Sequence, residues 1–230
     1  MNIHLNPDLD IDKISQNYSS ELRVRINHLL PVDQAQALSQ CLAEQVNYKH
    51  AFVLDNNYGE VSDEQLDNLP EKDRDQLLNG ILAQAAQGVG FWYERHAIKA
   101  EAPGLAGDLF QWLNSEALLN VIAQITGETA YSSSMIQATR YQPGDFLTRH
   151  KDDITEQKRQ TAFVINLSPS WHPDCGGLLQ FYEMDGTPRD TWSPDFNSLS
   201  LFDVSHVHSV TCVSPFAPEP RLAFSGWFQL

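Results

Sequence analysis

The sequence is poor in cysteine and in basic residues, and it has no long apolar run. Its 230 residues include three cysteines, Cys41, Cys175 and Cys212, with no CxxC spacing. That pattern argues against a disulfide framework and excludes a zinc ribbon. No apolar stretch approaches the length of a membrane span. Residues 1–12 lack the basic and apolar regions of a secretory signal. We therefore expect a cytoplasmic protein with no membrane partner.

The charge is strongly one-sided, with 15 basic residues against 30 acidic ones and a formal net charge of -15. Such a field repels nucleic acid and anionic membranes, and it favours a cationic macromolecular partner. The simpler alternative is that the acidity only keeps the protein soluble. With 42% hydrophobic and 20% charged residues, the composition is that of a globular protein, and we expect a single domain over residues 1–230.

The pattern of apolar residues changes near residue 128. Residues 1–127 carry apolar side chains mainly at helical spacing, and Ser62-Asp-Glu-Gln65 is a capping box. The expected helices are 31–46, 77–85 and 109–125, and the expected short strands are 21–29 and 49–54. This part of the chain is therefore expected to be a mainly helical support region.

Residues 128–230 show short apolar segments separated by turn signals such as Pro143-Gly144 and Asp185-Gly186. The expected strands are 131–141, 161–167, 178–182, 198–204, 208–213 and 221–228. Regularly spaced strands after a helical block predict an α+β fold, in which a β-sandwich or barrel has helices packed outside it.

The first candidate for metal chemistry is the step His150-Lys-Asp152. On a strand, residues two apart share a face, so the His150 imidazole and an Asp152 oxygen converge. Lys151 and Asp153 would point away. By itself this step is common and does not identify a site.

A second pair of histidines lies further along the chain, at His206 and His208. One of them, together with His150 and Asp152, would place two histidines and one carboxylate on one face of an octahedron. That arrangement leaves positions open for a cosubstrate and O2 in a non-haem Fe(II) site. Zinc held by the same ligands would more typically be hydrolytic. Because the two histidines are themselves two residues apart, spacing does not choose between them.

The last expected strand has two different faces. Arg221 and Ser225 share one face with Trp227, whereas Leu222 and Phe224 lie on the opposite, apolar face. An arginine inside a barrel needs a counter-anion, because an unpaired buried charge is costly, and its planar fork matches a carboxylate. The alternative is an ordinary surface arginine on an exposed face.

These motifs follow one another in a characteristic order. The segments are Arg140-Tyr-Gln-Pro-Gly-Asp-Phe-Leu-Thr-Arg-His150-Lys-Asp152, Gly176-Gly177, Asn197-Ser-Leu-Ser-Leu-Phe-Asp-Val204, His208-Ser-Val210 and Arg221-Leu-Ala-Phe-Ser-Gly-Trp227. The ordered set resembles the catalytic domain of the 2-oxoglutarate- and Fe(II)-dependent oxygenases. Within them it most resembles the prolyl-hydroxylase branch, particularly the ribosomal-protein prolyl hydroxylases. The match covers residues 128–230.

The resemblance implies a double-stranded β-helix, which is a jelly-roll or cupin-like barrel, as the catalytic core, with the N-terminal helices supporting it. It also implies that His150, Asp152 and a distal histidine hold the iron at the open end of the barrel. The distal step of the family reads His-x-Val, which matches His208-Ser-Val210 and assigns that role to His208.

The cosubstrate site is likewise implied by the resemblance. Arg221 would bind the distal carboxylate of 2-oxoglutarate with help from the Ser225 hydroxyl, and Tyr141 matches a tyrosine that also reaches the cosubstrate. Relatives often carry a second tyrosine on the strand after the His-x-Asp step. The matching position here is Asn166, whose amide still donates a hydrogen bond but is shorter.

The resemblance implies an enzyme that uses Fe(II), 2-oxoglutarate and O2, with ascorbate as an optional cofactor, to hydroxylate an unactivated C–H bond. The expected substrate is a prolyl residue in a basic protein, such as a ribosomal protein or a translation factor, with no direct contact to nucleic acid. Two alternatives stay open: a hydroxylase of a free amino acid such as proline, and a non-catalytic β-barrel that holds a structural metal. Residues 47–67 and 96–107 are candidate lids.

Overall fold

The computed structural model describes all 230 residues apart from the side chain of Thr155. The helices are α1 Ile11–Glu21, α2 Val32–Glu44, α3 Asp63–Asp67, α4 Glu71–Ala85, α5 Gly104–Leu113 and α6 Glu116–Thr126, with the short 3-10 helices η1 Thr155–Gln157 and η2 Pro173–Cys175. The strands are β1 Arg23–Asn27, β2 Lys49–Leu54, β3 Asn57–Val61, β4 Phe91–Ile98, β5 Ser133–Tyr141, β6 Phe146–His150, β7 Arg159–Asn166, β8 Leu179–Tyr182, β9 Pro188–Trp192, β10 Ser198–Asp203, β11 Val207–Val210 and β12 Arg221–Gln229. Over the described residues, no helix combines the length and the apolarity that crossing a bilayer requires.

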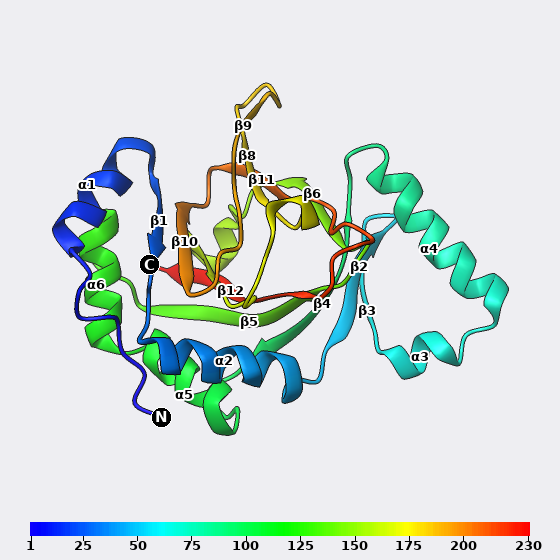
Figure 1. Cartoon of the computed structure of the whole chain (residues 1–230). Coiled ribbons are helices and arrows are strands. Elements are labelled where there is room, and N and C mark those ends of the chain that lie inside the picture. The colour runs from blue at the N-terminus through cyan, green and yellow to red at the C-terminus, as the bar shows by residue number, and fades with distance from the viewer.

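The strands form one antiparallel sheet that curls into a barrel. Its order is β1-β10-β7-β12-β5-β4-β6-β11-β8-β9, and β2 and β3 extend it beside β4. Figure 1 shows the curled sheet with α2 and α5 below it and α1 and α6 beside its β1 edge. The expected α+β architecture, with helices packed outside a barrel, is therefore confirmed.

Strand β12 shows how the sheet separates core from interior. It lies between β5 and β7, and its side chains alternate between the two faces. Leu222 and Phe224 join the main apolar core, which also includes residues of α2, α5 and α6. Arg221 and Ser225 face a pocket inside the barrel instead. The structure therefore confirms the expectation that this strand has one apolar face and one face that carries Arg221 and Ser225.

Two neighbouring substitutions on β12 should differ sharply in their cost. Phe224 is fully buried, so Phe224→Ala is expected to lower the free energy of unfolding by about 3–5 kcal/mol. Ser225 loses only the hydrogen bond that its hydroxyl accepts from Gln137 Nε2, so Ser225→Ala should cost about 1 kcal/mol. Urea denaturation of both variants measures the difference, and equal costs would contradict the assignment of the two faces.

Part of the sheet comes from residues before position 128. Strands β1 and β2 lie close to the expected ranges, but β3, β4 and helix α1 were not expected. Strand β4 pairs with β2, β5 and β6 and is thus central to the barrel. Its sequence carries Glu94 and Arg95 among aromatic residues, which hides the strand pattern.

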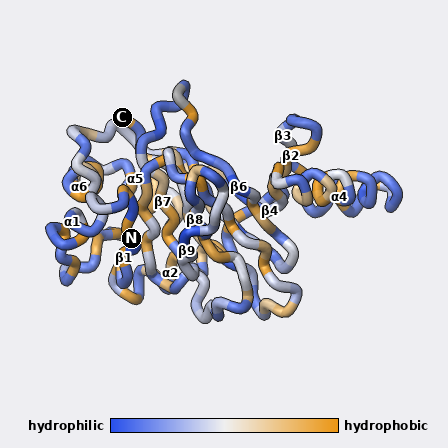
Figure 2. Tube along the Cα trace, turned by 90° about the horizontal axis from the view of Figure 1, so that it is seen from above, coloured by the Kyte–Doolittle hydropathy of each residue, from blue (hydrophilic) through white to orange (hydrophobic). Residues whose placement is uncertain are grey.

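Residues 63–85, which hold α3 and α4, form an arm that projects from the barrel (Figures 1 and 2). In the described part of the arm, Ile81 is the one buried side chain. At the base, His50 Nε2–H donates to Asp63 Oδ1 at 2.9 Å, and the His50 ring stacks on Trp92. The capping box expected at Ser62 and Gln65 is present and begins α3.

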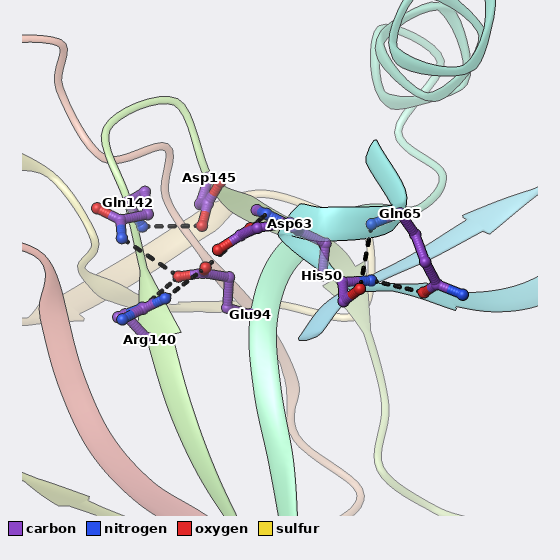
Figure 3. A network of polar contacts seen from close by, with 8 residues as sticks. His50, Asp63, Gln65, Glu94, Arg140, Gln142 and Asp145 are labelled. Carbon is purple, nitrogen blue, oxygen red and sulfur yellow. Dashed lines mark hydrogen bonds and ion pairs between the residues drawn. The ribbon is translucent and has the colours of Figure 1, made fainter. Parts of the chain in front are cut away.

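A buried polar network lies next to this base (Figure 3). The Glu94 carboxylate accepts from Arg140 Nη2 at 2.7 Å and from Gln142 Nε2 at 3.3 Å. The Gln142 backbone N–H donates to Asp145 Oδ2 at 2.8 Å. Burial of Asp145, with Glu94 nearby, raises the pKa of that carboxyl to about 8.

Asp145 should make the stability of the protein depend on pH. Its pKa is raised in the folded state, so between about pH 4 and pH 8 the folded protein binds a proton that the unfolded chain has released. The free energy of unfolding therefore falls as the pH rises through this window. Asp145→Asn removes this contribution. The free energy of unfolding of the variant, taken relative to wild type, is therefore expected to rise by on the order of 5 kcal/mol between pH 4 and pH 8.

The measurement is urea denaturation of both proteins at several pH values, read as the difference between variant and wild type. Asp75→Asn on the exposed face of α4 is the matched control and should show no such difference. A difference that stays constant with pH would show that Asp145 titrates normally.

Candidate metal and cosubstrate site

Three side chains with metal-binding atoms converge at one end of the barrel. His150 ends β6, and His208 lies directly opposite it on the antiparallel neighbour β11. Asp152 follows β6 and places its two carboxylate oxygens 3.5 Å from His150 Nε2 and 3.4 Å from His208 Nε2. One donor atom from each residue lies within 4.8 Å of the other two, which is close enough for one cation to contact all three.

The orientation of both imidazoles is fixed by the backbone. His150 Nδ1 lies 2.9 Å from the carbonyl oxygen of Thr148, and His208 Nδ1 lies 3.0 Å from that of His206. A carbonyl oxygen only accepts, so each Nδ1 carries the proton and donates it. Each Nε2 then presents a lone pair toward Asp152, which is the tautomer that a metal ligand needs.

The protonation of the cluster also suits a divalent cation. Burial, together with the neighbouring His150, lowers the pKa of His208 to about 4. Burial works against ionised Asp152, but the two histidines outweigh it and hold the pKa of that carboxyl well below its usual range. Burial also disfavours protonated His150, yet its hydrogen bond to Asp152 leaves the pKa of that imidazole raised. A cation would take the place of the His150 proton.

The alternative residues left open by spacing lie elsewhere. The His206 Nε2–H donates to the carbonyl oxygen of Glu21 at 2.9 Å, and its ring packs edge-on against Phe181. Asp153 is exposed to solvent. The structure thus brings together His208 and Asp152 and leaves their neighbours outside the cluster.

Arg221 is a buried cation in the same pocket. Its side chain is 3% exposed, and burial lowers the pKa of its guanidinium. Its Nη2 donates to Asn166 Oδ1 at 3.2 Å, while its Nε has no hydrogen-bond partner in the described chain. No carboxylate of the described residues lies within ion-pair distance of it. An unpaired buried charge is costly, so the site is complementary to an anion.

The remaining residues expected at the cosubstrate site surround Arg221 unequally. Tyr141 is buried and its ring lies 5.2 Å from Arg221 Cζ. Ser225 lines the pocket and accepts a hydrogen bond from Gln137. Asn166 is not among the residues that line the described pocket; its Nδ2 donates to Ser198 Oγ while its Oδ1 accepts from Arg221. Asn166 therefore holds the Arg221 guanidinium in place without itself lining the cavity.

The cluster and Arg221 open onto one cavity of about 290 Å³ inside the barrel. Several walls of the cavity are not predicted by the sequence, namely Tyr58, Phe91, Tyr93, Arg95 and Arg159. Three of them alternate along β4, and this strand was itself not expected. Of the two candidate lids, residues 47–67 form β2, β3 and α3 and contribute Tyr58 to the cavity, whereas 96–107 supply none of its described lining residues.

Arg159 stands out among the missed residues. Its Cζ lies 3.5 Å from the centroid of the Trp227 ring, a close cation–π contact. Burial lowers the pKa of this guanidinium, and its Nε lacks a hydrogen-bond partner among the described residues. No sequence signal distinguished it, because a single arginine at the start of a strand is ordinary.

Comparison with known proteins agrees with this geometry. The model of the 2OG-Fe(II) oxygenase superfamily matches residues 136–229. Prolyl 3-hydroxylase OGFOD1 of Xenopus laevis is 31% identical over 187 residues, which are 78% of this chain and 34% of that protein. This chain thus spans about a third of the length of that relative.

Solved structures show the same fold. A prolyl-4-hydroxylase of Pseudomonas putida superposes with a TM-score of 0.62 at 20% identity, covering 95% of this chain and 98% of that chain. A Trichoplax adhaerens prolyl hydroxylase, in complex with a peptide fragment of the hypoxia inducible factor oxygen degradation domain, gives 0.61 at 17% identity and covers 95% and 90%. The expected double-stranded β-helix is therefore confirmed.

Residues 136–229 of the chain match the 2OG-Fe(II) oxygenase superfamily, a class of dioxygenases. Within that class the chain is similar to the prolyl hydroxylases, as the motif order indicated. Oxygenases of this superfamily use Fe(II), 2-oxoglutarate and O2, and the residues of the cavity are suited to hold the metal and the cosubstrate. Two imidazole nitrogens and a carboxylate suit Fe(II), and the guanidinium without an anion suits a dicarboxylic cosubstrate.

Proposed function

We propose that this protein is an Fe(II)- and 2-oxoglutarate-dependent hydroxylase that acts on a prolyl residue of a protein. The observation that carries the proposal is that one cavity holds both the His150–Asp152–His208 cluster and a buried guanidinium without an anion. The similar proteins named above are prolyl hydroxylases, and one was solved with a peptide fragment bound.

In this proposal His150, Asp152 and His208 hold the iron through two Nε2 atoms and a carboxylate oxygen. When bound, iron and 2-oxoglutarate together supply the oxidising chemistry that activates O2. The carbonyl oxygens of Thr148 and His206 keep both imidazoles in the required tautomer. The walls of the cavity exclude bulk water from the reacting atoms.

The cosubstrate is anchored by Arg221, whose fork pairs with its distal carboxylate. Ser225 and Tyr141 contribute hydroxyl groups on the same cavity wall. Asn166 holds the guanidinium in place through Oδ1, which leaves its direct contact with the cosubstrate a prediction. We further assign the proposed iron ligands and Arg221 to a catalytic core over residues 128–230. Residues 1–127 support this core, and their strands β3 and β4 also supply walls of the cavity. The proposed location is the cytoplasm.

A basic protein substrate is favoured by charge. The net charge is -15, and the exposed face of the arm carries Asp67, Glu71, Asp73 and Asp75. The arm joins the barrel through β3 (Figure 2). Tyr58 of this strand lines the cavity. A basic segment beside the target proline would be attracted to this side of the molecule. A ribosomal protein or a translation factor has this character.

A free amino acid is the second candidate substrate, and Arg159 is the observation that favours it. This guanidinium faces the cavity, and no carboxylate of the described residues forms an ion pair with it. It is therefore available to a free α-carboxylate, which a residue inside a polypeptide does not have.

The test compares three probes in the presence of Fe(II), 2-oxoglutarate and O2. They are a peptide with one proline flanked by lysines, the same peptide with glutamates in place of the lysines, and free L-proline. We expect hydroxyproline from the lysine peptide, with kcat/KM at least about tenfold above that of the glutamate peptide at low salt. The preference should shrink in Asp73→Asn/Asp75→Asn and at high ionic strength.

The other possible outcomes of this experiment distinguish the candidate substrates or contradict the proposal. Hydroxylation of free proline alone selects the second candidate. Equal rates with the two peptides would remove the argument from charge. Consumption of 2-oxoglutarate with no hydroxyproline from any probe would contradict prolyl hydroxylation.

A further inference from the structure

Aromatic rings form a continuous row from the interior of the cavity to the protein surface. The rings of Tyr141 and Tyr93 stack in parallel with centroids 4.7 Å apart and an interplanar angle of 4°. Phe91 lies 5.4 Å from Tyr93, and Tyr58 lies 6.4 Å from Phe91. All four line the cavity that holds His150, Asp152 and His208. We call these four residues the aromatic row.

The fold builds the row from three strands. Phe91 and Tyr93 are two apart on β4 and so point to the same face, and Tyr141 extends to them from the neighbouring strand β5. Tyr58 comes from β3, across the short strand β2. Ala51 of β2, which pairs with Tyr93, is small and fully buried and leaves the space over β2 to the larger rings.

The two ends of the row differ in a way that gives it a direction. Tyr141 and Tyr93 are buried, whereas Tyr58 is 52% exposed. The Tyr58 hydroxyl donates a hydrogen bond to Glu60 Oε1, and Arg95 Nε donates to the same oxygen at 3.1 Å. A proton acceptor is therefore already bonded to the phenol that meets solvent.

We infer that the aromatic row carries oxidising equivalents from the iron site to Tyr58 when cosubstrate is consumed without a substrate to hydroxylate. The inference rests on the proposed function, because that reaction supplies the oxidant. A strong oxidant left in a closed site attacks nearby side chains, and phenols lose an electron more readily than the other groups in this row. Transfer along the row would move the damage to the surface.

Trp227 is the competing target, and its surroundings oppose oxidation. Its ring lines the cavity, but Arg159 stacks on it with Cζ 3.5 Å from the centroid. A cation held against the indole disfavours the positive charge that a one-electron loss creates. At Tyr58 the proton leaves with the electron, so no net charge forms on the ring beside Arg95.

Tyr58 would lose one electron along Phe91, Tyr93 and Tyr141 to the oxidant that bound iron, 2-oxoglutarate and O2 would supply at His150, Asp152 and His208. This electron accounts for one of the two oxidising equivalents, and a soluble reductant of the ascorbate class would supply the second electron. The phenolic proton of Tyr58 moves to the Glu60 carboxylate, and a neutral phenoxyl radical remains. A water-soluble reductant of the ascorbate class then gives one hydrogen atom to the phenoxyl oxygen and restores the tyrosine. Glu60 returns its proton to solvent.

The experiment uses the full chain with Fe(II), 2-oxoglutarate and O2, without any substrate and without ascorbate. Succinate is measured, and modified tyrosines are located by peptide mass mapping. In wild type we expect oxygenated Tyr58 and dityrosine-linked dimers through Tyr58, both suppressed by ascorbate. In Tyr93→Phe, modification of Tyr58 is lost and oxidation appears at Tyr141 or Trp227 instead.

Two further variants sharpen the test. Glu60→Gln removes the proton acceptor from an exposed strand and is expected to decrease Tyr58 modification without a change in fold. Tyr182→Phe replaces a tyrosine that lies outside the described lining of the cavity and should leave the wild-type pattern intact. Freeze-quenched samples should show a tyrosyl radical signal that Tyr58→Phe removes.

The opposite results overturn the inference. Succinate formation with unmodified Tyr58 in wild type would show that the aromatic row carries no oxidising equivalents to Tyr58. Equal Tyr58 modification in wild type and Tyr93→Phe would point to a diffusible oxidant. Absence of succinate in every sample would overturn the proposed function, and with it this inference.

Discussion

Replacing His208 with alanine is expected to abolish Fe(II)-dependent consumption of 2-oxoglutarate while the barrel stays folded. The substitution removes one of three donors from a cluster whose atoms lie within 4.8 Å of one another. Loss of an outer-sphere partner of a metal ligand already costs about 10–100-fold in affinity, and loss of the ligand itself costs more. Anaerobic titration with Fe(II) and 2-oxoglutarate measures this, through the weak visible charge-transfer band of the iron chelate.

His206→Ala is the matched control, because it changes the same residue type two positions away. His206 donates to the carbonyl oxygen of Glu21 and faces away from the cluster. Its loss should cost about 1 kcal/mol of stability at most and leave the band unchanged. A band that survives in His208→Ala and disappears in His206→Ala would show that the distal ligand is the wrong histidine.

The metal cluster could be predicted from the sequence, but not entirely for the right reason. The expectation placed His150 and Asp152 on one strand face, whereas β6 ends at His150 and Asp152 follows it. The Asp152 backbone N–H instead donates to the carbonyl oxygen of Val204 at 3.3 Å, which ties it to the turn before β11. The order of motifs identified the residues, and a long-range backbone contact positions them.

The walls of the cavity could not be predicted, because they depend on tertiary pairing. Strand β4 carries Glu94 in its middle, which a strand pattern read from sequence treats as exposed. In the fold this carboxylate is buried because Arg140 of the neighbouring strand neutralises it. The two residues are 46 positions apart in the chain, so no local sequence pattern predicts that they pair.

Asn166 shows the limit of transferring a role by position. The expectation gave it a contact with the cosubstrate, in place of a tyrosine of the relatives. In the structure its Oδ1 accepts from Arg221 and its Nδ2 donates to Ser198. In this structure the shorter side chain supports the guanidinium of Arg221, and a direct contact between Asn166 and the cosubstrate stays a prediction.

Arg221 should reveal its function through opposite effects on binding and on stability. Arg221→Met removes a buried cation that has no anion among the described residues, and it substitutes an apolar side chain of similar length. The protein without iron and 2-oxoglutarate is expected to unfold with a free energy about 1–4 kcal/mol higher than wild type. Its affinity for 2-oxoglutarate should fall by about 2–5 kcal/mol, because the carboxylate of the cosubstrate loses its partner.

Two further variants separate an anchor from a general charge effect. Arg221→Lys keeps the charge but replaces a fork with a point charge, so the Kd for 2-oxoglutarate should rise by about 10–100-fold. Arg159→Lys changes a second guanidinium of the same cavity and should leave that Kd unchanged. Calorimetric titration of 2-oxoglutarate in the presence of iron measures both. If Arg221→Met lowers the free energy of unfolding and retains affinity for 2-oxoglutarate, the arginine is a structural residue and the cosubstrate is held elsewhere. If the variant instead gains stability and loses affinity, Arg221 is a binding residue that costs the protein stability.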